Sequence, residues 1–233
     1  MMTTVIVNGA FGKMGQLACQ VVKQTKGFKL AKQLGRADDL AAVLAEVNPD
    51  IVIDFTVADA AFQNAEMILQ SGAHPIIGTS GLSESDVEAL SKYDVPGAII
   101  PNFSIGAVLM MQFSMIAAKY FPRAEIVEKH HEHKKDAPSG TSIRTAEIIA
   151  SMRDNEAVAC QRNQYNDVCG IPIHSIRQAG FLASQDVIFG HTGETLTISH
   201  QSIHRDCFAE GIALCLQNIM SLDHLVYGLE YFL

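Results

Sequence analysis

The sequence is poor in charge. Charged residues make up 18% of its 233 residues and hydrophobic residues 48%. Disordered chains combine low hydrophobicity with high charge, so this composition excludes an intrinsically disordered protein. The length suffices for one large domain or two modest ones.

The sequence also lacks an excess of basic residues and any long apolar run. It holds 17 Lys and Arg against 25 Asp and Glu, a formal net charge of −8. Because non-specific nucleic-acid binding needs a basic surface, we expect no nucleic-acid partner. No apolar run approaches the ~18 residues of a membrane-spanning helix. The first residues have no basic segment typical of a secretory signal, so we expect no membrane association.

Cysteines are few and widely separated. There are five, an odd number, and none form a C-x-x-C pair. This spacing argues against a disulfide framework and against a zinc site built from cysteines. We therefore expect a reducing compartment, the cytoplasm.

The first half of the sequence alternates short apolar runs with helical patterns. This alternation predicts βαβ units around a parallel sheet. The predicted strands are Thr3–Val7, Phe28–Leu34, Ile51–Phe55, Pro75–Ile77 and Gly97–Ile100.

Beyond Pro101–Phe103 the alternation stops, which places a domain boundary there. The second half predicts an open, mostly antiparallel sheet flanked by helices. Its predicted helices are Ser104–Tyr120, Ser139–Met152 and Phe208–Ser221, and its predicted strands are Glu125–His133, Ile173–Arg177, Asp186–Phe189 and Thr195–His200.

A glycine-rich loop, Gly9-Ala-Phe-Gly12-Lys-Met-Gly15, joins the first predicted strand to a helix. Glycines in this position allow a tight turn and let a pyrophosphate approach the positive end of the helix. The spacing departs from G-x-G-x-x-G, because Phe11 stands where the second glycine is expected. The alternative is a tight turn that binds no ligand.

The second predicted strand ends in Leu34-Gly35-Arg36. Dinucleotide-binding folds usually carry an acidic residue here that holds the ribose 2′-hydroxyl. Gly35 occupies that place, and Arg36 suits a 2′-phosphate. The alternatives are that Arg36 stacks on adenine or is only solvated.

Three histidines and three lysines lie within Lys129–Lys135. In a strand, His131 and His133 would share one face and His130 would lie on the other. Adjacent lysines would repel a metal cation, so we expect no metal and favour an anion. The alternative is a solvated, charged loop.

The residues that follow this cluster, Ser139-Gly140-Thr141, open a predicted helix. Backbone N–H groups at a helix N-terminus form an anion site. Together with the cluster they would bind a small molecule with two carboxylates. Histidine can exchange a proton near neutral pH, and lysine can protonate an electron-rich carbon.

The run from His130 to Thr141 closely resembles the signature of the 4-hydroxy-tetrahydrodipicolinate reductase (dihydrodipicolinate reductase) family. Further segments match that family in order along most of the chain. They are Gly9–Gly15, Asp54–Thr56, Gly78–Gly81, Pro101–Gly106, Gly193–His200 and Arg205–Gly211.

The resemblance implies an α/β protein with a Rossmann-like parallel-sheet cofactor domain and an α+β substrate and oligomerisation domain with an open mixed sheet. Residues 1–102 and 208–233 would form the dinucleotide-binding domain. Residues 103–207 would bind substrate and build a homotetramer. The cofactor would be NADPH or NADH.

The resemblance also implies the reaction. A cyclic imine dicarboxylate is reduced by hydride from NAD(P)H after its 4-hydroxyl leaves as water, in lysine and diaminopimelate biosynthesis. His130 and Lys134 would be catalytic proton-transfer residues. His131, Ser139, Gly140 and Thr141 would bind substrate. The cofactor would contact Gly9, Ala10, Phe11, Gly12, Lys13, Met14, Arg36, Gly78, Thr79, Ser80, Ile100, Pro101, Asn102 and Phe103.

Two other functions share the glycine loop. One is another NAD(P)-dependent amino-acid or aspartate dehydrogenase of related architecture. The other is a non-catalytic dinucleotide-binding sensor. Neither needs the run from His130 to Thr141, which favours the reductase.

Overall fold

A parallel sheet of six strands, in the order β11-β5-β4-β3-β1-β2, organises the first part of the chain. The computed structural model describes residues 2–153 and 167–233. The sheet lies in one unit, Met1–Ser104 with Phe208–Leu233, and a second unit spans Ile105–Cys207. Its strands are β1 (Thr3–Asn8), β2 (Phe28–Leu34), β3 (Ile51–Asp54), β4 (His74–Ile77), β5 (Gly97–Ile99) and β11 (Leu225–Tyr227).

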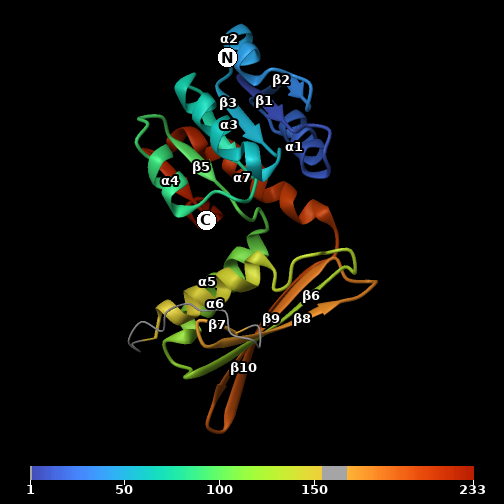
Figure 1. Cartoon of the computed structure of the whole chain (residues 1–233), viewed down its shortest axis with the longest axis vertical. Helices are drawn as coiled ribbons and strands as arrows, with labels where there is room; N and C mark the ends of the chain where they lie inside the picture. The colour runs from blue at the N-terminus through green and yellow to red at the C-terminus, as the bar shows by residue number, and fades with distance from the viewer. Residues whose placement is uncertain (1, 154–166) are drawn as a thin grey trace. The chain divides into compact units, whose positions relative to one another are not determined.

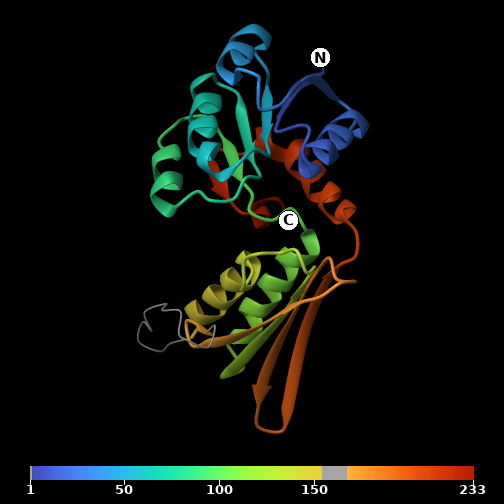
Figure 2. The same ribbon diagram turned by 45° about the vertical axis from the view of Figure 1, so that its right-hand side comes forward.

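Helices cover both faces of this sheet (Figures 1 and 2). They are α1 (Lys13–Gln24), α2 (Leu40–Val47), α3 (Ala58–Gln70), α4 (Glu84–Leu90) and α7 (Ala209–Asn218), with η2 (Ile219–Ser221) and η3 (Leu229–Phe232). Strand β1 lies between β2 and β3. From β1 the chain runs to β2 on one side, and it then returns to β3 on the other side. Ligands bind at such switch points, beyond the carboxyl ends of the strands.

The central strands are apolar throughout because both of their faces are covered. Every residue of β3 is buried, and Ile51, Val52 and Ile53 are completely so. A parallel sheet between two helical layers requires such continuous apolar runs. Local signals fix the helix starts: Asp39 caps α2, and Ser83 with Asp86 forms a capping box on α4.

The second unit contains a mixed five-stranded sheet in the order β10-β9-β6-β8-β7. Strand β6 pairs parallel with β8 and antiparallel with β9. The elements are α5 (Ile105–Ala118), β6 (Arg123–His130), α6 (Gly140–Ser151), β7 (Asp167–Val168), β8 (Ile171–Arg177), β9 (Ala183–His191), β10 (Glu194–Ser202) and η1 (Arg205–Phe208).

Helices α5 and α6 pack on one face of this sheet (Figure 2). Their buried residues, including Met110 and Ile149, share a core with Ile126 of β6 and Phe189 of β9. On the opposite face, alternate residues such as Ile176 and Ile188 are exposed, at 38% and 37%. The sheet is therefore open on one side, as the sequence predicts.

Two expectations need correction. Strand β6 ends at His130, so the predicted strand over Glu125–His133 is too long. Cys169 is disulfide-bonded, whereas Cys19, Cys207 and Cys215 are free thiols. Sequence spacing does not fix the distance between cysteines in a fold, so wide spacing could not exclude a disulfide.

No helix in the described part of the chain is long and apolar enough to cross a membrane.

Candidate active site

A buried carboxylate lies at the carboxyl edge of the parallel sheet. Asp54 ends β3 and is completely buried. Its Oδ2 accepts hydrogen bonds from the side-chain amides of Asn8 and Asn64, each 2.9 Å long. Its Oδ1 accepts from the backbone N–H and hydroxyl of Thr56 and from the hydroxyl of Thr79. Asp54 thus joins the end of β1 to the segments that follow β3 and β4.

The glycine loop needs two of its glycines for packing. Gly9 has a φ of +75°, and a β-carbon there would lie 2.4 Å from the carbonyl oxygen of Phe55. A β-carbon at Gly15 would lie 2.0 Å from the carbonyl oxygen of Gly9. At Gly12, by contrast, a β-carbon would make only an ordinary contact of 3.5 Å. The protein itself therefore does not require glycine at position 12, whereas close approach of a pyrophosphate would.

The loop leads into an uncapped helix. Gly12 is the N-cap of α1 and supplies no side-chain hydrogen bond, and the first turn holds no acidic residue. Its first N–H groups and the adjacent Lys13 leave a positive end suited to an anion. The residues present thus fit a dinucleotide cofactor.

The end of β2 carries an acidic residue that the sequence pattern did not reveal. Oδ2 of Asp38 accepts a 2.7 Å hydrogen bond from the backbone N–H of Gly35. Arg36 is exposed beside it. Asp38 follows Gly35 by three residues, and only the turn after β2 returns its carboxylate to the strand end.

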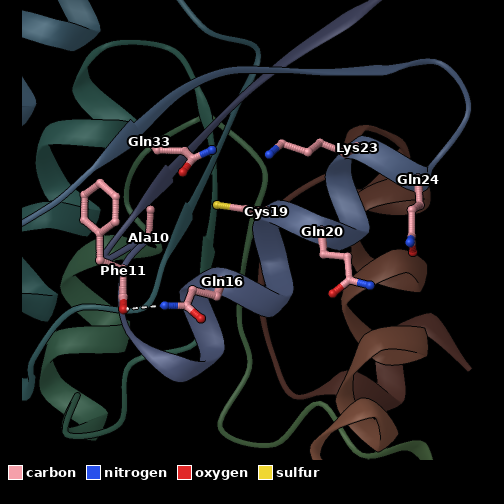
Figure 3. Close-up of a pocket in the computed structure, with 8 residues that line it drawn as sticks. All are labelled: Ala10, Phe11, Gln16, Cys19, Gln20, Lys23, Gln24 and Gln33. Atoms are coloured by element: carbon pink, nitrogen blue, oxygen red, sulfur yellow. Dashed lines mark hydrogen bonds between the residues drawn. The ribbon is translucent and has the colours of Figure 1, made fainter.

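A cavity of about 370 Å³ borders the glycine loop on the side of β2 (Figure 3). Four glutamines and one lysine contribute to its lining, which also includes the thiol of Cys19, whose pKa is raised by burial. Gln16 donates a 3.0 Å hydrogen bond to the carbonyl oxygen of Phe11. A ligand reaching past the loop would meet amides and one ammonium group. The lining residues are Ala10, Phe11, Gln16, Cys19, Gln20, Lys23, Gln24 and Gln33.

Two more predicted cofactor segments follow β4 and β5 at the same edge: Gly78–Ser80 and Ile100–Phe103. The rings of Phe55 and Phe103 lie 5.4 Å apart, and a β-carbon at Gly78 would lie within 3 Å of both. Parallel strands bring all the predicted cofactor residues to one edge of one unit.

In the second unit, β6 presents a histidine with an acidic partner. Glu128 and His130 lie two residues apart and therefore on one face of the strand. Nδ1 of His130 contacts Oε2 of Glu128, which is completely buried. Arg177 of β8 binds both oxygens of Glu128, at 2.9 and 2.7 Å.

Glu128 is ionised in the folded protein. Burial alone would raise the pKa of its carboxyl, but hydrogen bonds from His130 and Arg177 outweigh burial and lower the pKa to about 2. A carboxylate that accepts several hydrogen bonds is stabilised in its charged form.

Lys134 lies in the turn after β6 and pairs with Asp136. Its Nζ is 2.7 Å from Oδ2 of Asp136, and this hydrogen bonding lowers the pKa of the Asp136 carboxyl. Arg177 also donates a 2.7 Å hydrogen bond to the carbonyl oxygen of Asp136. One guanidinium therefore connects the supports of His130 and Lys134.

His131 and His133 lie beyond the end of β6, so strand alternation does not place them. Their ring centroids are nevertheless 6.3 Å apart. Partial burial lowers the pKa of His131, and so do the nearby charges of His130, His133, Arg205 and Lys134. His131 is the less exposed of the two, and His133 has a side chain 86% exposed.

A buried polar network holds the N-terminus of α6. Ser139 caps the helix by accepting a hydrogen bond from the N–H of Ser142. The hydroxyl of Ser142 donates to Oε1 of Gln185, and Nε2 of Gln185 donates to the hydroxyl of Thr145. These four side chains are at most 4% exposed. The network ties the predicted anion site of Gly140 and Thr141 to β9.

The structure thus gathers the predicted substrate and proton-transfer residues at the end of β6 and the start of α6. Sequence reasoning missed Glu128, Arg177 and Gln185. The two-residue spacing of Glu128 and His130 on a strand was a usable signal. Arg177 and Gln185 come from distant strands and gave no local signal.

Models of two domains match the chain. "Dihydrodipicolinate reductase, N-terminus" matches residues 3–103, and "Dihydrodipicolinate reductase, C-terminus" matches residues 106–233. A 4-hydroxy-tetrahydrodipicolinate reductase of Legionella pneumophila (strain Corby) is 44% identical, with all of both chains covered. A protein of the same name from Coxiella burnetii (strain Dugway 5J108-111) is 46% identical, with 99% of each covered.

Solved structures agree with these matches. A dipicolinate-bound dihydrodipicolinate reductase from Paenisporosarcina sp. TG-14 has a TM-score of 0.85 and 32% identity, with both chains fully covered. A probable dehydrogenase from Thermotoga maritima has a TM-score of 0.66 at 10% identity over 99% of this chain and 92% of its own, a likeness of fold alone. The chain therefore belongs to the dihydrodipicolinate reductase family.

Proposed function

We propose that this protein reduces 4-hydroxy-tetrahydrodipicolinate to tetrahydrodipicolinate with NAD(P)H, in lysine and diaminopimelate biosynthesis. The observation that carries the proposal is the cluster at the end of β6. There a carboxylate-bound histidine and a lysine lie close in sequence to Gly140–Thr141, a helix start whose first turn holds no acidic residue. This set suits a dicarboxylate that must also gain a proton.

Substrate binding falls to the second unit, Ile105–Cys207. The N–H groups of Gly140 and Thr141 bind one carboxylate, since α6 begins there and its first turn holds no acidic residue. Ser139 keeps this turn in place as the N-cap. Lys134 and His131 contact the other carboxylate, with the lysine exchanging Asp136 for the substrate.

Proton transfer falls to His130 and Lys134. Reduction leaves an electron-rich ring that takes up a proton, and an ammonium group or an imidazolium can donate one. Lys134 is the donor, and His130 donates or accepts. Lys134 is only partly exposed, at 22% of its side chain.

Cofactor binding falls to the first unit, Met1–Ser104 with Phe208–Leu233. Bound NAD(P)H supplies the hydride. Gly9 to Met14 and the start of α1 hold the pyrophosphate, while Gly78–Ser80 and Ile100–Phe103 line the nicotinamide. Asp54 keeps the loops after β1, β3 and β4 in register.

Both NADH and NADPH are accepted. The exposed guanidinium of Arg36 suits the 2′-phosphate of NADPH. The carboxylate of Asp38, held at the N–H of Gly35, suits the 2′-hydroxyl of NADH. Arg36→Ala should raise the KM for NADPH more than that for NADH, and Asp38→Asn should do the reverse. Equal effects on both cofactors in both variants would reject these contacts.

The active form is a cytoplasmic homotetramer built through the open sheet face. The exposed Ile176 and Ile188 on this face support the assembly, because a partner would cover them. Light scattering of the purified protein tests the tetramer, and Ile188→Glu should lower the measured mass. A tetramer that survives this change would reject the face.

One assay tests the reaction. Substrate is generated in situ from pyruvate and aspartate semialdehyde, and loss of reduced-nicotinamide absorbance is followed. We expect oxidation of NADH and NADPH that depends on both precursors. Lys134→Ala and His130→Ala should each lower kcat by about 100-fold or more while the thermal midpoint is kept. Absence of substrate-dependent oxidation by the intact protein would reject the proposal.

A further inference from the structure

The ion pair of Glu128 and Arg177, which contacts His130, has more hydrogen bonds than a salt bridge with a purely structural role requires. Glu128 is completely buried, and both of its oxygens are bound by Arg177. The third partner is Nδ1 of His130. Within the ranges that the structure describes, and apart from the two hydrogen bonds of Arg177, the buried carboxylate of Glu128 therefore hydrogen-bonds to a single group, Nδ1 of His130.

Strand register fixes this arrangement. In the parallel pair β6 and β8, Glu128 lies opposite Ser175, and His130 lies opposite Arg177. The guanidinium therefore reaches back along the sheet to the carboxylate, and the carboxylate reaches forward to the imidazole. Three side chains on two neighbouring strands hold one another, so the ring of His130 has little freedom to turn.

An ionised carboxylate only accepts hydrogen bonds. Its partner nitrogen must carry the hydrogen, which settles the tautomer of a neutral histidine. Among residues 2–153 and 167–233, no hydrogen bond engages Nε2 of His130. Nε2 is therefore the ring nitrogen that remains for a ligand.

We propose that Glu128 is a positioning residue: its carboxylate, anchored by Arg177, holds the ring of His130 with Nδ1 protonated and leaves Nε2 to exchange a proton with the substrate. The proposal rests on the proposed function for the identity of that substrate. The tautomer of His130 does not depend on it.

Arg177 extends this support to the lysine. Its Nη2 binds Oε1 of Glu128 at 2.7 Å and the carbonyl oxygen of Asp136 at 2.7 Å. The carboxylate of Asp136 pairs in turn with Lys134. Loss of the Glu128 carboxylate leaves the contact of Arg177 with Asp136 in place, and should therefore disturb proton transfer by His130 more than substrate binding.

The first experiment is ¹⁵N NMR of the full-length protein labelled at histidine, with His130 assigned by its loss in His130→Asn. In the wild type near pH 8, we expect His130 to show a protonated Nδ1 and an unprotonated Nε2. The opposite tautomer would overturn the proposal. This measurement holds whether or not the protein turns over the proposed substrate.

The second experiment is steady-state kinetics of Glu128→Gln. We expect kcat to fall by about 10- to 100-fold, the range for loss of a partner that orients a functional histidine. The Kd for dipicolinate should change by less than about threefold. Glu147→Gln is the control: it breaks the exposed Arg144–Glu147 pair on α6 and should leave kcat unchanged. An unchanged kcat in Glu128→Gln would overturn the proposal.

A further variant covers the case in which Glu128→Gln folds poorly. The double variant Glu128→Leu/Arg177→Met removes both charges and leaves no unpaired buried ion, an exchange that folds often tolerate. We expect it to fold, to lose kcat as Glu128→Gln does, and to show a mixture of His130 tautomers. Wild-type kcat in the folded double variant would overturn the proposal.

Discussion

The ring of Phe11 lies against the backbone of Gly35. A β-carbon at Gly35 would lie 2.8 Å from Cδ2 of Phe11 and 2.9 Å from Cε2. Both residues depart from the usual dinucleotide-binding pattern, Phe11 in place of a glycine and Gly35 in place of an acid. The two departures therefore lie in contact: with the ring in this position, there is no room for a β-carbon at the strand end.

This contact predicts the effect of restoring the usual acid. Gly35→Glu should push the Phe11 ring out of the loop and raise the KM for NADH and NADPH by about tenfold, since small displacements in binding sites are costly. The double variant Phe11→Ala/Gly35→Glu should recover much of the loss. A Gly35→Glu enzyme with wild-type KM values would show that the ring moves aside freely.

The hydrogen bonds of Asp54 should contribute both to the stability of the fold and to cofactor binding. Asp54→Asn places an amide N–H₂ among groups that already donate hydrogen bonds, so the free energy of unfolding should fall by about 3 kcal/mol in urea titrations. The Kd for NADH should rise, because Asn8 leads directly into Gly9. The exposed Asp94 is the control, and Asp94→Asn should change stability by less than about 0.5 kcal/mol. Equal effects of the two changes would refute the role of Asp54.

Ionised Glu128 should account for part of the loss of folding stability in acid. Its pKa is about 2 in the folded protein against an ordinary 4.5. Its ionised form therefore stabilises the fold fully above pH 4.5, and this contribution is lost as the pH falls from 4.5 towards 2. The contribution is on the order of 3 kcal/mol. The difference in unfolding free energy between the wild type and Glu128→Gln should narrow as pH falls through that window. A constant difference would contradict the lowered pKa.

The hydrogen bonds of Gln185 in β9 should hold the start of α6 in place. Gln185→Ala leaves the buried hydroxyls of Ser142 and Thr145 without their amide partner, which should cost about 2 kcal/mol of stability. Dipicolinate should bind more weakly, because the first turn of α6 loses its anchor. Gln217→Ala, on the exposed face of α7, should change neither measurement. Calorimetry of both variants decides the matter, and unchanged dipicolinate binding in Gln185→Ala would reject the link.

The sequence predicts much of the cofactor unit because its signals are local. Strand β2 is found over the predicted Phe28–Leu34. Strand β3 is buried as its continuous apolar run requires. The short strand β11 escaped prediction, since Leu225–Tyr227 is too brief to show a period and becomes a strand only by pairing with β5.

In the second unit too, some functional residues could be predicted from local sequence signals and others could not. Composition, the alternation of strands and helices, and the run from His130 to Thr141 determined the fold class, the family and the candidate proton-transfer residues. Only the tertiary structure decided which groups support them. Arg177 is 49 residues from Glu128, and Gln185 is 43 residues from Ser142. Strand pairing and helix packing create such contacts between distant residues, and no local pattern in a sequence encodes them.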